Sequence, residues 1–253
     1  MCVVALAWRA HPRWQLVVAG NRDEYHARPA APLARWDDKS HILAGRDLQS
    51  GGTWLGASEQ GRFVVVTNLR GYGLPEKGRP SRGALVTDLL EGADPDVVAI
   101  DAYNPVNLIS IAGDQVRFLS NRPEPLRTNL SSGLYGLSNG TLDEPWPKTL
   151  RLKSILLDWL TGDADRPELL LDGLREEVLP DIGRDPATPS DVPQEPNHSP
   201  IFIRNPVYGT RCGSVVAIDR HGRGIFIERR FSAEGKAAGD TSLPFEWSAR
   251  ARV

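Results

Sequence analysis

The sequence of 253 residues has little of several features that define special classes of protein. Its two cysteines, Cys2 and Cys212, are too few for a disulfide framework, and no cysteine or histidine spacing is typical of a zinc site. No apolar run approaches the roughly 20 residues that cross a bilayer, and the N-terminus lacks the pattern of a signal peptide. We therefore expect a cytoplasmic protein with no metal site and no integral membrane segment.

The sequence also lacks an excess of charge of either sign. Its 30 lysine and arginine residues nearly balance 32 aspartate and glutamate residues, and its pI is about 6.2. A balanced charge gives no general reason to bind nucleic acid or an anionic membrane surface. With 40% hydrophobic residues, the composition is that of a globular protein, and we expect a single domain over residues 1–253. The oligomeric state is not indicated.

Apolar runs separated by short turns predict antiparallel hairpins along the whole chain. Several of these runs, such as "FVVVT" and "SVVAI", are apolar without alternation, so we expect both faces of these strands to be covered. Four hairpins are predicted, over residues 2–20, 53–68, 106–121 and 213–230.

Helical patterns lie between the hairpins and supply the expected cover. The segment 81–92 opens with a capping serine and closes with glycine, and 145–162 places apolar residues at three-to-four spacing. A third helix is predicted at 166–179 and a weaker fourth at 95–103. These elements favour an α+β fold, a four-layer αββα sandwich of two antiparallel sheets flanked by helices. The proline-rich stretch at about 180–205 reads as a long loop inside the domain.

Cys2 is the first residue that suggests chemistry. If Met1 is removed, Cys2 carries a free α-amine beside its thiol, and an amine with a reference pKa of roughly 7.7–8.0 can take the thiol proton near neutral pH. The alternative is a structural cysteine buried at the start of a strand, which position alone favours.

Polar residues at predicted strand ends could complete such a site. A nucleophile of this kind needs an acceptor for its ammonium group, donors for an oxyanion and nearby positive charge. Asp23, in the tetrapeptide "NRDE", could be the acceptor. The other candidates at strand ends are Asn21, Arg22, Asn68, Asn139 and Arg211. Each of these residue types also occurs in turns, so "NRDE" alone could be a solvated turn.

The whole chain resembles a known family in seven ordered blocks. The sequence is similar to the NRDE family, also called the transport and Golgi organisation family, which resembles the N-terminal nucleophile hydrolases of the choloylglycine hydrolase and penicillin V acylase branch. The αββα sandwich of that branch agrees with the layers expected above. The blocks are "MCVV", "AGNRDEYHARP", "GGTWLG", "TNLRG", "RGALVTDLL", "YGLSNG" and "YGTR".

The resemblance implies a role for five positions. Cys2 would be the nucleophile and, through its amine, the base, while Asp23 would hold that amine. Asn68 would contribute to the oxyanion hole, Asn139 would support the N-terminus, and Arg211 would stabilise the site electrostatically.

Other positions receive weaker expectations. In the hydrolases the first arginine lies several residues before the aspartate, whereas here Arg22 adjoins Asp23 and alternation turns it to the opposite face. Arg22 and Glu24 are then expected to pair with each other or with surrounding loops, and Glu24 is expected to be structural. Trp54 is expected in the core or the wall of the pocket, and Cys212 is expected to be a buried thiol facing away from Arg211.

The leading hypothesis is a hydrolase of an amide or acyl bond in a small molecule, acting through a thioester at Cys2 without a required cofactor. The alternative is a carrier of haem or lipid ligands that uses the same pocket without hydrolysis, as members of this family have been associated with haem mobilisation and lipid metabolism. A third alternative is an interaction protein with a vestigial site. The sequence does not identify the substrate.

Overall fold

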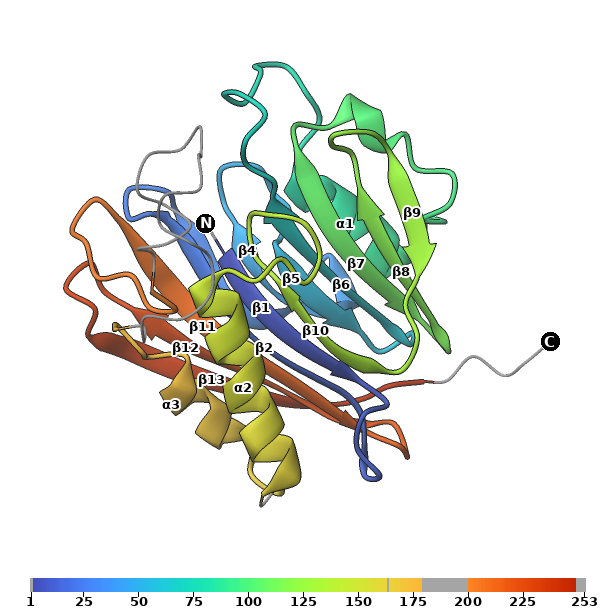
Figure 1. Ribbon diagram of the computed structural model, residues 1–253, viewed down its shortest axis with the longest axis vertical. Helices are drawn as coiled ribbons and strands as arrows, with labels where there is room; N and C mark the ends of the chain where they lie inside the picture. The colour runs from blue at the N-terminus through green and yellow to red at the C-terminus, as the bar shows by residue number, and fades with distance from the viewer. Residues whose placement is uncertain (1, 163, 179–199, 249–253) are drawn as a thin grey trace.

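Two antiparallel sheets form the centre of the computed structural model, which describes residues 2–162, 164–178 and 200–248 (Figure 1). The first sheet has six strands in the order β10 (Gly133–Leu137), β1 (Cys2–Trp8), β2 (Trp14–Tyr25), β11 (Tyr208–Asp219), β12 (Arg223–Phe231) and β13 (Ala237–Glu246). The second has seven strands in sequence order, β3 (Ala30–Trp36), β4 (Lys39–Asp47), β5 (Leu55–Ser58), β6 (Arg62–Asn68), β7 (Val106–Ala112), β8 (Gln115–Ser120) and β9 (Leu126–Asn129).

Helices cover the outer face of each sheet, so the expected αββα sandwich is confirmed (Figure 1). Helix α2 (Pro147–Thr161) and the short α3 (Leu170–Gly173) pack on the six-stranded sheet, and α1 (Arg82–Glu91) packs on the seven-stranded sheet. A third apolar cluster, which includes Leu6 and Phe63, fills the space between the sheets. Because each sheet is covered on both faces, its central strands are apolar throughout.

The four predicted hairpins are all present as antiparallel pairs, namely β1 with β2, β5 with β6, β7 with β8 and β11 with β12. The helix α1 begins and ends as predicted, with Ser81 accepting from the Ala84 amide and Gly92 in a left-handed conformation.

Two predicted helices are much shorter than expected. The segment 166–179 forms only the 3-10 turn η2 (Pro167–Leu169) followed by the single turn of α3, which ends near Gly173. Glycine is a poor helix former, which accounts for the early end. The segment 95–103 forms only the 3-10 turn η1 (Ile100–Ala102). Most of the predicted loop at about 180–205 lies outside the described residues. None of the helices in the described ranges has the length and apolar character needed to cross a bilayer.

A bulge interrupts the longest strand pairing of the first sheet. Along β11 and β2, Thr210 pairs with Asp23 and Cys212 pairs with Arg22, so Arg211 is the extra residue. Bulges re-aim side chains and often lie beside functional sites. This one lies at the same end of the sheet as Cys2, which also pairs with Arg22.

Candidate functional site

A cavity of about 510 Å³ lies at this end of the first sheet. Two of the eight residues predicted for the site, Asn21 and Asn139, do not line it. The other six line it, namely Cys2, Arg22, Asp23, Trp54, Asn68 and Arg211.

Cys2 begins β1 on the face that is turned toward the second sheet, because the alternating Val4 and Leu6 belong to the cluster between the sheets. Burial and the charge of Asp23 raise the pKa of its thiol, while a hydrogen bond from the Asp23 backbone and the charge of Arg22 lower it. The thiol of Cys2, the guanidinium group of Arg22 and the backbone amide of Asp23 therefore lie close together in the cavity wall.

Asp23 is almost completely buried, with 3% of its surface exposed. Thr210 donates a hydrogen bond of 2.6 Å from Oγ1 to the Oδ1 atom of Asp23, and the same hydroxyl accepts the Ile203 amide at 2.9 Å. Burial raises the pKa of Asp23, and the charge of Lys148 on α2 lowers it. The carboxyl group is thus fixed in orientation beside the start of β1.

Asn21 lies on the other side of the sheet. Its Nδ2 atom donates to the carbonyl oxygens of Leu174 and Ile201, both at 2.8 Å, and the residue is fully buried. It therefore ties β2 to the segments after α3 and before β11, and it is a structural anchor.

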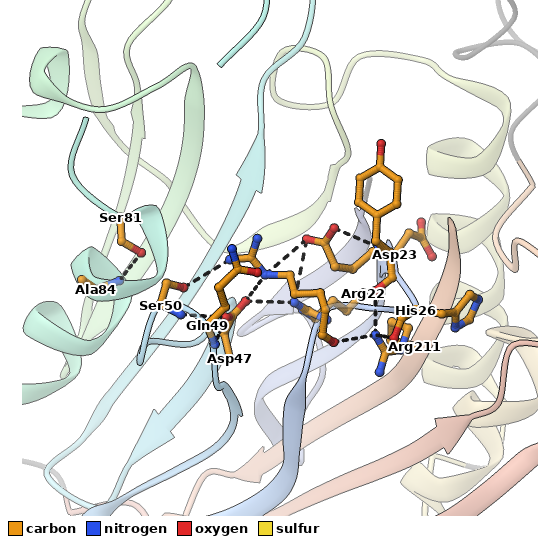
Figure 2. A network of polar contacts seen from close by, with 12 residues as sticks. Arg22, Asp23, His26, Asp47, Gln49, Ser50, Ser81, Ala84 and Arg211 are labelled. Carbon is orange, nitrogen blue, oxygen red and sulfur yellow. Dashed lines mark hydrogen bonds and ion pairs between the residues drawn. The ribbon is translucent and has the colours of Figure 1, made fainter. Parts of the chain in front are cut away.

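Arg22 and Glu24 face the cavity and lie 3.9 Å apart between Nη2 and Oε2. Arg22 also pairs with Asp47 at 3.2 Å, and Arg28 pairs with the same carboxylate at 2.6 Å (Figure 2). Burial raises the pKa of Asp47, but the bonds from Arg28 and Ser50 outweigh it and hold the pKa below its usual range. The expected alternation along "NRDE" is therefore present, with Arg22 and Glu24 on one face and Asn21 on the other.

Asn68 and Asn139 meet where β6 ends. Asn139 is fully buried and donates from Nδ2 to the Asn68 carbonyl at 2.6 Å, while the adjacent Ser138 donates from Oγ to the Cys2 carbonyl at 2.8 Å. The side chain of Asn68 lines the cavity and makes no hydrogen bond within the described residues. Ser138 and Asn139 together join the start of β1 to the end of β6.

Arg211 holds the turn after β2 with one atom. Its Nη1 donates to the carbonyl oxygens of Tyr25, His26 and Arg28, at 2.8, 3.2 and 2.9 Å (Figure 2). Cys212 is buried as expected, but the expectation that it faces away from Arg211 is wrong, since both residues line the cavity. The bulge at Arg211 breaks the alternation on which that expectation depended.

Trp54 precedes β5 and forms part of the cavity wall. Its ring packs over Gly20, where an added Cβ atom would lie 3.3 Å from the Cη2 atom.

Three residues of the site were missed from the sequence. Thr210 orients Asp23, Ser138 holds Cys2, and Arg82 lines the cavity from the first turn of α1. Burial lowers the pKa of Arg82, and the nearby Cys2 thiol raises it. All three lie inside the blocks "YGTR", "YGLSNG" and "RGALVTDLL", and their place in these blocks is the signal in the sequence that points to them. Among the described residues, no group of three or more potential ligands is placed to hold a metal ion.

The fold is that of the N-terminal nucleophile hydrolases. An N-acylethanolamine-hydrolyzing acid amidase orthologue from Caenorhabditis elegans superposes with a TM-score of 0.51 at 12% identity, over 85% of this chain and 92% of that one. A mutant of the conjugated bile acid hydrolase from Clostridium perfringens superposes with a TM-score of 0.54 at 9% identity, over 96% of this chain and 92% of that one. At such low identities these likenesses show the fold alone.

The family is shown by sequence. The model of the family described as Transport and Golgi organisation 2 matches residues 1–233. The human Transport and Golgi organization protein 2 homolog is 32% identical over 90% of this chain and 92% of its own length. The Drosophila melanogaster protein of the same name is 26% identical over 90% of this chain and 91% of its own length. The chain belongs to the Transport and Golgi organisation 2 family.

Proposed function

We propose that the protein hydrolyses an amide or acyl bond of a small molecule through a thioester at Cys2. The observation that carries the proposal is the position of Cys2 at the start of β1, in the wall of a 510 Å³ cavity and beside the buried carboxyl group of Asp23. Two solved structures that share the fold are of proteins named as an N-acylethanolamine-hydrolyzing acid amidase orthologue and a conjugated bile acid hydrolase.

In the first half of the proposed reaction, removal of Met1 leaves the α-amine of Cys2 as the base, and Asp23 holds the ammonium form. The amine takes the thiol proton, and the thiolate attacks the substrate carbonyl carbon. The side-chain amide of Asn68, which has no partner within the described residues, donates to the oxygen as it becomes negative. The leaving amine or alcohol then takes the proton from the α-ammonium group.

In the second half, a water molecule attacks the thioester carbonyl and gives a proton to the α-amine. Collapse of the tetrahedral intermediate breaks the bond between carbon and sulfur, releases the acid and returns the proton to the thiolate. Thr210 acts through Asp23, and Asn139 acts through Asn68, so both are positioning residues.

The N-terminal amine can be tested directly. One alanine inserted before Cys2 keeps the thiol but converts its amine to an amide, which has no basic lone pair. Acylation by p-nitrophenyl butyrate, followed as the burst of p-nitrophenol and as the mass of the acylated N-terminal peptide, should fall by roughly a hundredfold or more. The Cys2→Ser variant keeps the amine and should lose the thioester.

Mass spectrometry must first establish that Met1 is absent from the parent protein and that the alanine is present in the variant. Under those conditions, undiminished acylation of the extended protein would show that the amine is not the base. Melting temperatures of both variants should stay near that of the parent, because neither change removes substantial buried apolar surface.

A second candidate function is a carrier of haem or lipid ligands that leaves the bound molecule intact. The observation in its favour is that burial raises the pKa of the Cys2 thiol, which favours the protonated, unreactive form. Titration with haem should then give a saturable Soret shift, and loss of that shift on changing Cys2 or a histidine would identify the axial ligand. A linear, unsaturated response would count against the carrier.

A further inference from the structure

The cavity wall carries more positive than negative charge. Seven arginines and four carboxyl groups line the cavity. This imbalance is local, because the whole chain has a formal net charge of -2. Charge of one sign in a concave site attracts ligands of the opposite sign more strongly than the same charge on an open surface.

Four of the seven arginines have carboxylate partners. Arg22 and Arg28 share Asp47, as described above. Arg46 binds Asp38 through two hydrogen bonds of 2.8 and 3.0 Å. Arg79 binds Glu76 through two hydrogen bonds of 3.0 Å each. The Arg46 and Arg79 pairs are bidentate, and Arg22 and Arg28 together face two carboxylates, Asp47 and Glu24, so these four arginines do not account for the excess.

The other three, Arg82, Arg211 and Arg230, form no ion pair with any carboxylate among the described residues. Arg82 donates to the Pro105 carbonyl at 3.0 Å, and Arg211 donates to three carbonyl oxygens. Arg230 makes no side-chain hydrogen bond within the described part of the chain, and its Nε atom is buried without a partner. A desolvated cation without a counterion is unfavourable, which makes these groups suited to an incoming anion.

The acidic residue nearest to Arg230 along β12 is Glu228, and it offsets the positive charge of Arg230 only weakly. Glu228 lies two residues before Arg230 on β12, on the same face, and it accepts the Leu33 amide at 2.8 Å. Burial raises the pKa of Glu228, so its negative charge is disfavoured. Glu228 therefore leaves much of the charge of Arg230 available.

The three arginines lie on both walls of the cavity. Arg211 and Arg230 belong to β11 and β12 of the first sheet, and Arg82 belongs to α1, which covers the second sheet. Ser81 and Gly83 also line the cavity, and the first turn of α1 contains no acidic residue. The positive end of the α1 dipole therefore adds to the attraction.

We infer that the ligand of this cavity carries an anionic oxygen group, a carboxylate or a phosphate, that Arg82, Arg211 and Arg230 bind. The inference rests on the proposed function for the assignment of the cavity as the substrate site. Along the row of paired residues Cys2, Arg22, Cys212 and Arg230, the outer two are three strands apart, roughly 14 Å between backbones. A substrate with its scissile bond at Cys2 and its anionic group toward Arg230 would be elongated.

The test compares the alkylation of Cys2 by iodoacetate, an anion, and by iodoacetamide, which is neutral. Both reagents consume the same thiolate, so the ratio of their rates is independent of the thiol pKa. The ratio should exceed that of N-acetylcysteinamide in solution. It should fall several-fold in Arg82→Gln, whose charge acts on the Cys2 thiol, and by a smaller factor in Arg230→Gln, because the Coulomb energy falls with distance.

Arg166→Gln is the matched control. It makes the same change in net charge at an exposed residue outside the cavity, which pairs with Glu168 at 2.9 Å, and should leave the ratio unchanged. A parental ratio equal to that of the free thiol, or equal ratios in all three variants, would overturn the inference. Neither rate requires turnover, so the anion site and the proposed hydrolysis can fail separately.

Calorimetric titration decides the matter if Cys2 resists both reagents. Saturable heat from inorganic phosphate or from acetate, weakened at least fivefold in Arg230→Gln, would support the anion site. The anion that binds would distinguish a phosphate from a carboxylate group. Absence of saturable heat from both anions would overturn the inference.

Discussion

Replacing Thr210 by valine removes one oxygen atom and leaves the volume of the side chain almost unchanged. That oxygen donates to Asp23 at 2.6 Å and accepts the Ile203 amide at 2.9 Å, in a residue with 1% of its surface exposed. Loss of a hydrogen bond to a charged group costs about 1.5–3 kcal/mol, and an unpaired buried amide costs about 1–3 kcal/mol. We expect the free energy of unfolding to fall by about 4 kcal/mol.

Thr210→Ser is the control for this prediction. It keeps the oxygen and deletes one buried methyl group, so the free energy of unfolding should fall by only about 1 kcal/mol. Denaturant titration of both variants measures the difference. If Asp23 holds the N-terminal amine, Thr210→Val should also lower the acylation rate with p-nitrophenyl butyrate at unchanged KM. Thr210→Ser should acylate at close to the parental rate, because it keeps the hydroxyl group.

A double-mutant cycle with Asp23→Asn would then isolate the coupling between the hydroxyl and the carboxyl group. Residues joined by such a contact show interaction energies of about 0.5–3 kcal/mol. Equal stability of the valine and serine variants, together with zero coupling to Asp23, would refute the assigned role of Thr210.

Three further predictions address the same site. Asn68→Ala should lower turnover by about a hundredfold to a thousandfold with substrate affinity largely retained, and a change in affinity alone would reassign Asn68 to substrate contact. Burial raises the pKa of Asp23, so its contribution to stability is complete below the unfolded-state value of about 3.9 and is lost as the pH rises through the folded-state value. The stability of Asp23→Asn relative to the parent should therefore increase between about pH 3.5 and about pH 7, measured as the denaturant midpoint of each protein at these two pH values. An equal change of both midpoints with pH would contradict this prediction. Burial raises the pKa of Cys212 well above its usual value, so Cys212 should react with iodoacetamide far more slowly than Cys2. Cys212→Ser should retain acylation at Cys2, and its loss would give Cys212 a part in the chemistry.

Local sequence was sufficient for the eight strands of the four hairpins and for two of the helices, whereas β3, β4, β9 and β13 were not predicted. The hairpins follow from apolar runs closed by turn residues, and α1 follows from Ser81 and Gly92, because caps act within a single turn. The segment after Pro167 was misjudged as a long helix, since its leucines satisfy a helical period while Gly173 ends the helix after one turn.

Family membership was also available from sequence, through the ordered blocks that begin with "MCVV". Those blocks contain some of the residues that line the cavity, such as Cys2 and Asp23, but not others, such as Arg230, and they do not assign contacts. Asn21 and Asp23 are two residues apart on β2, yet Asn21 binds carbonyl groups behind the sheet while Asp23 lies beside Cys2.

The tertiary structure decided the partners of each polar side chain. Thr210 is 187 residues from Asp23, and Ser138 is 136 residues from Cys2, so only strand pairing and loop packing bring these atoms together. The bulge at Arg211 changes which face the following side chain takes, and it exists only relative to the partner strand β2. Sequence alone thus determined which residues could form a site, and long-range register determined which of them meet, because register is a property of two strands.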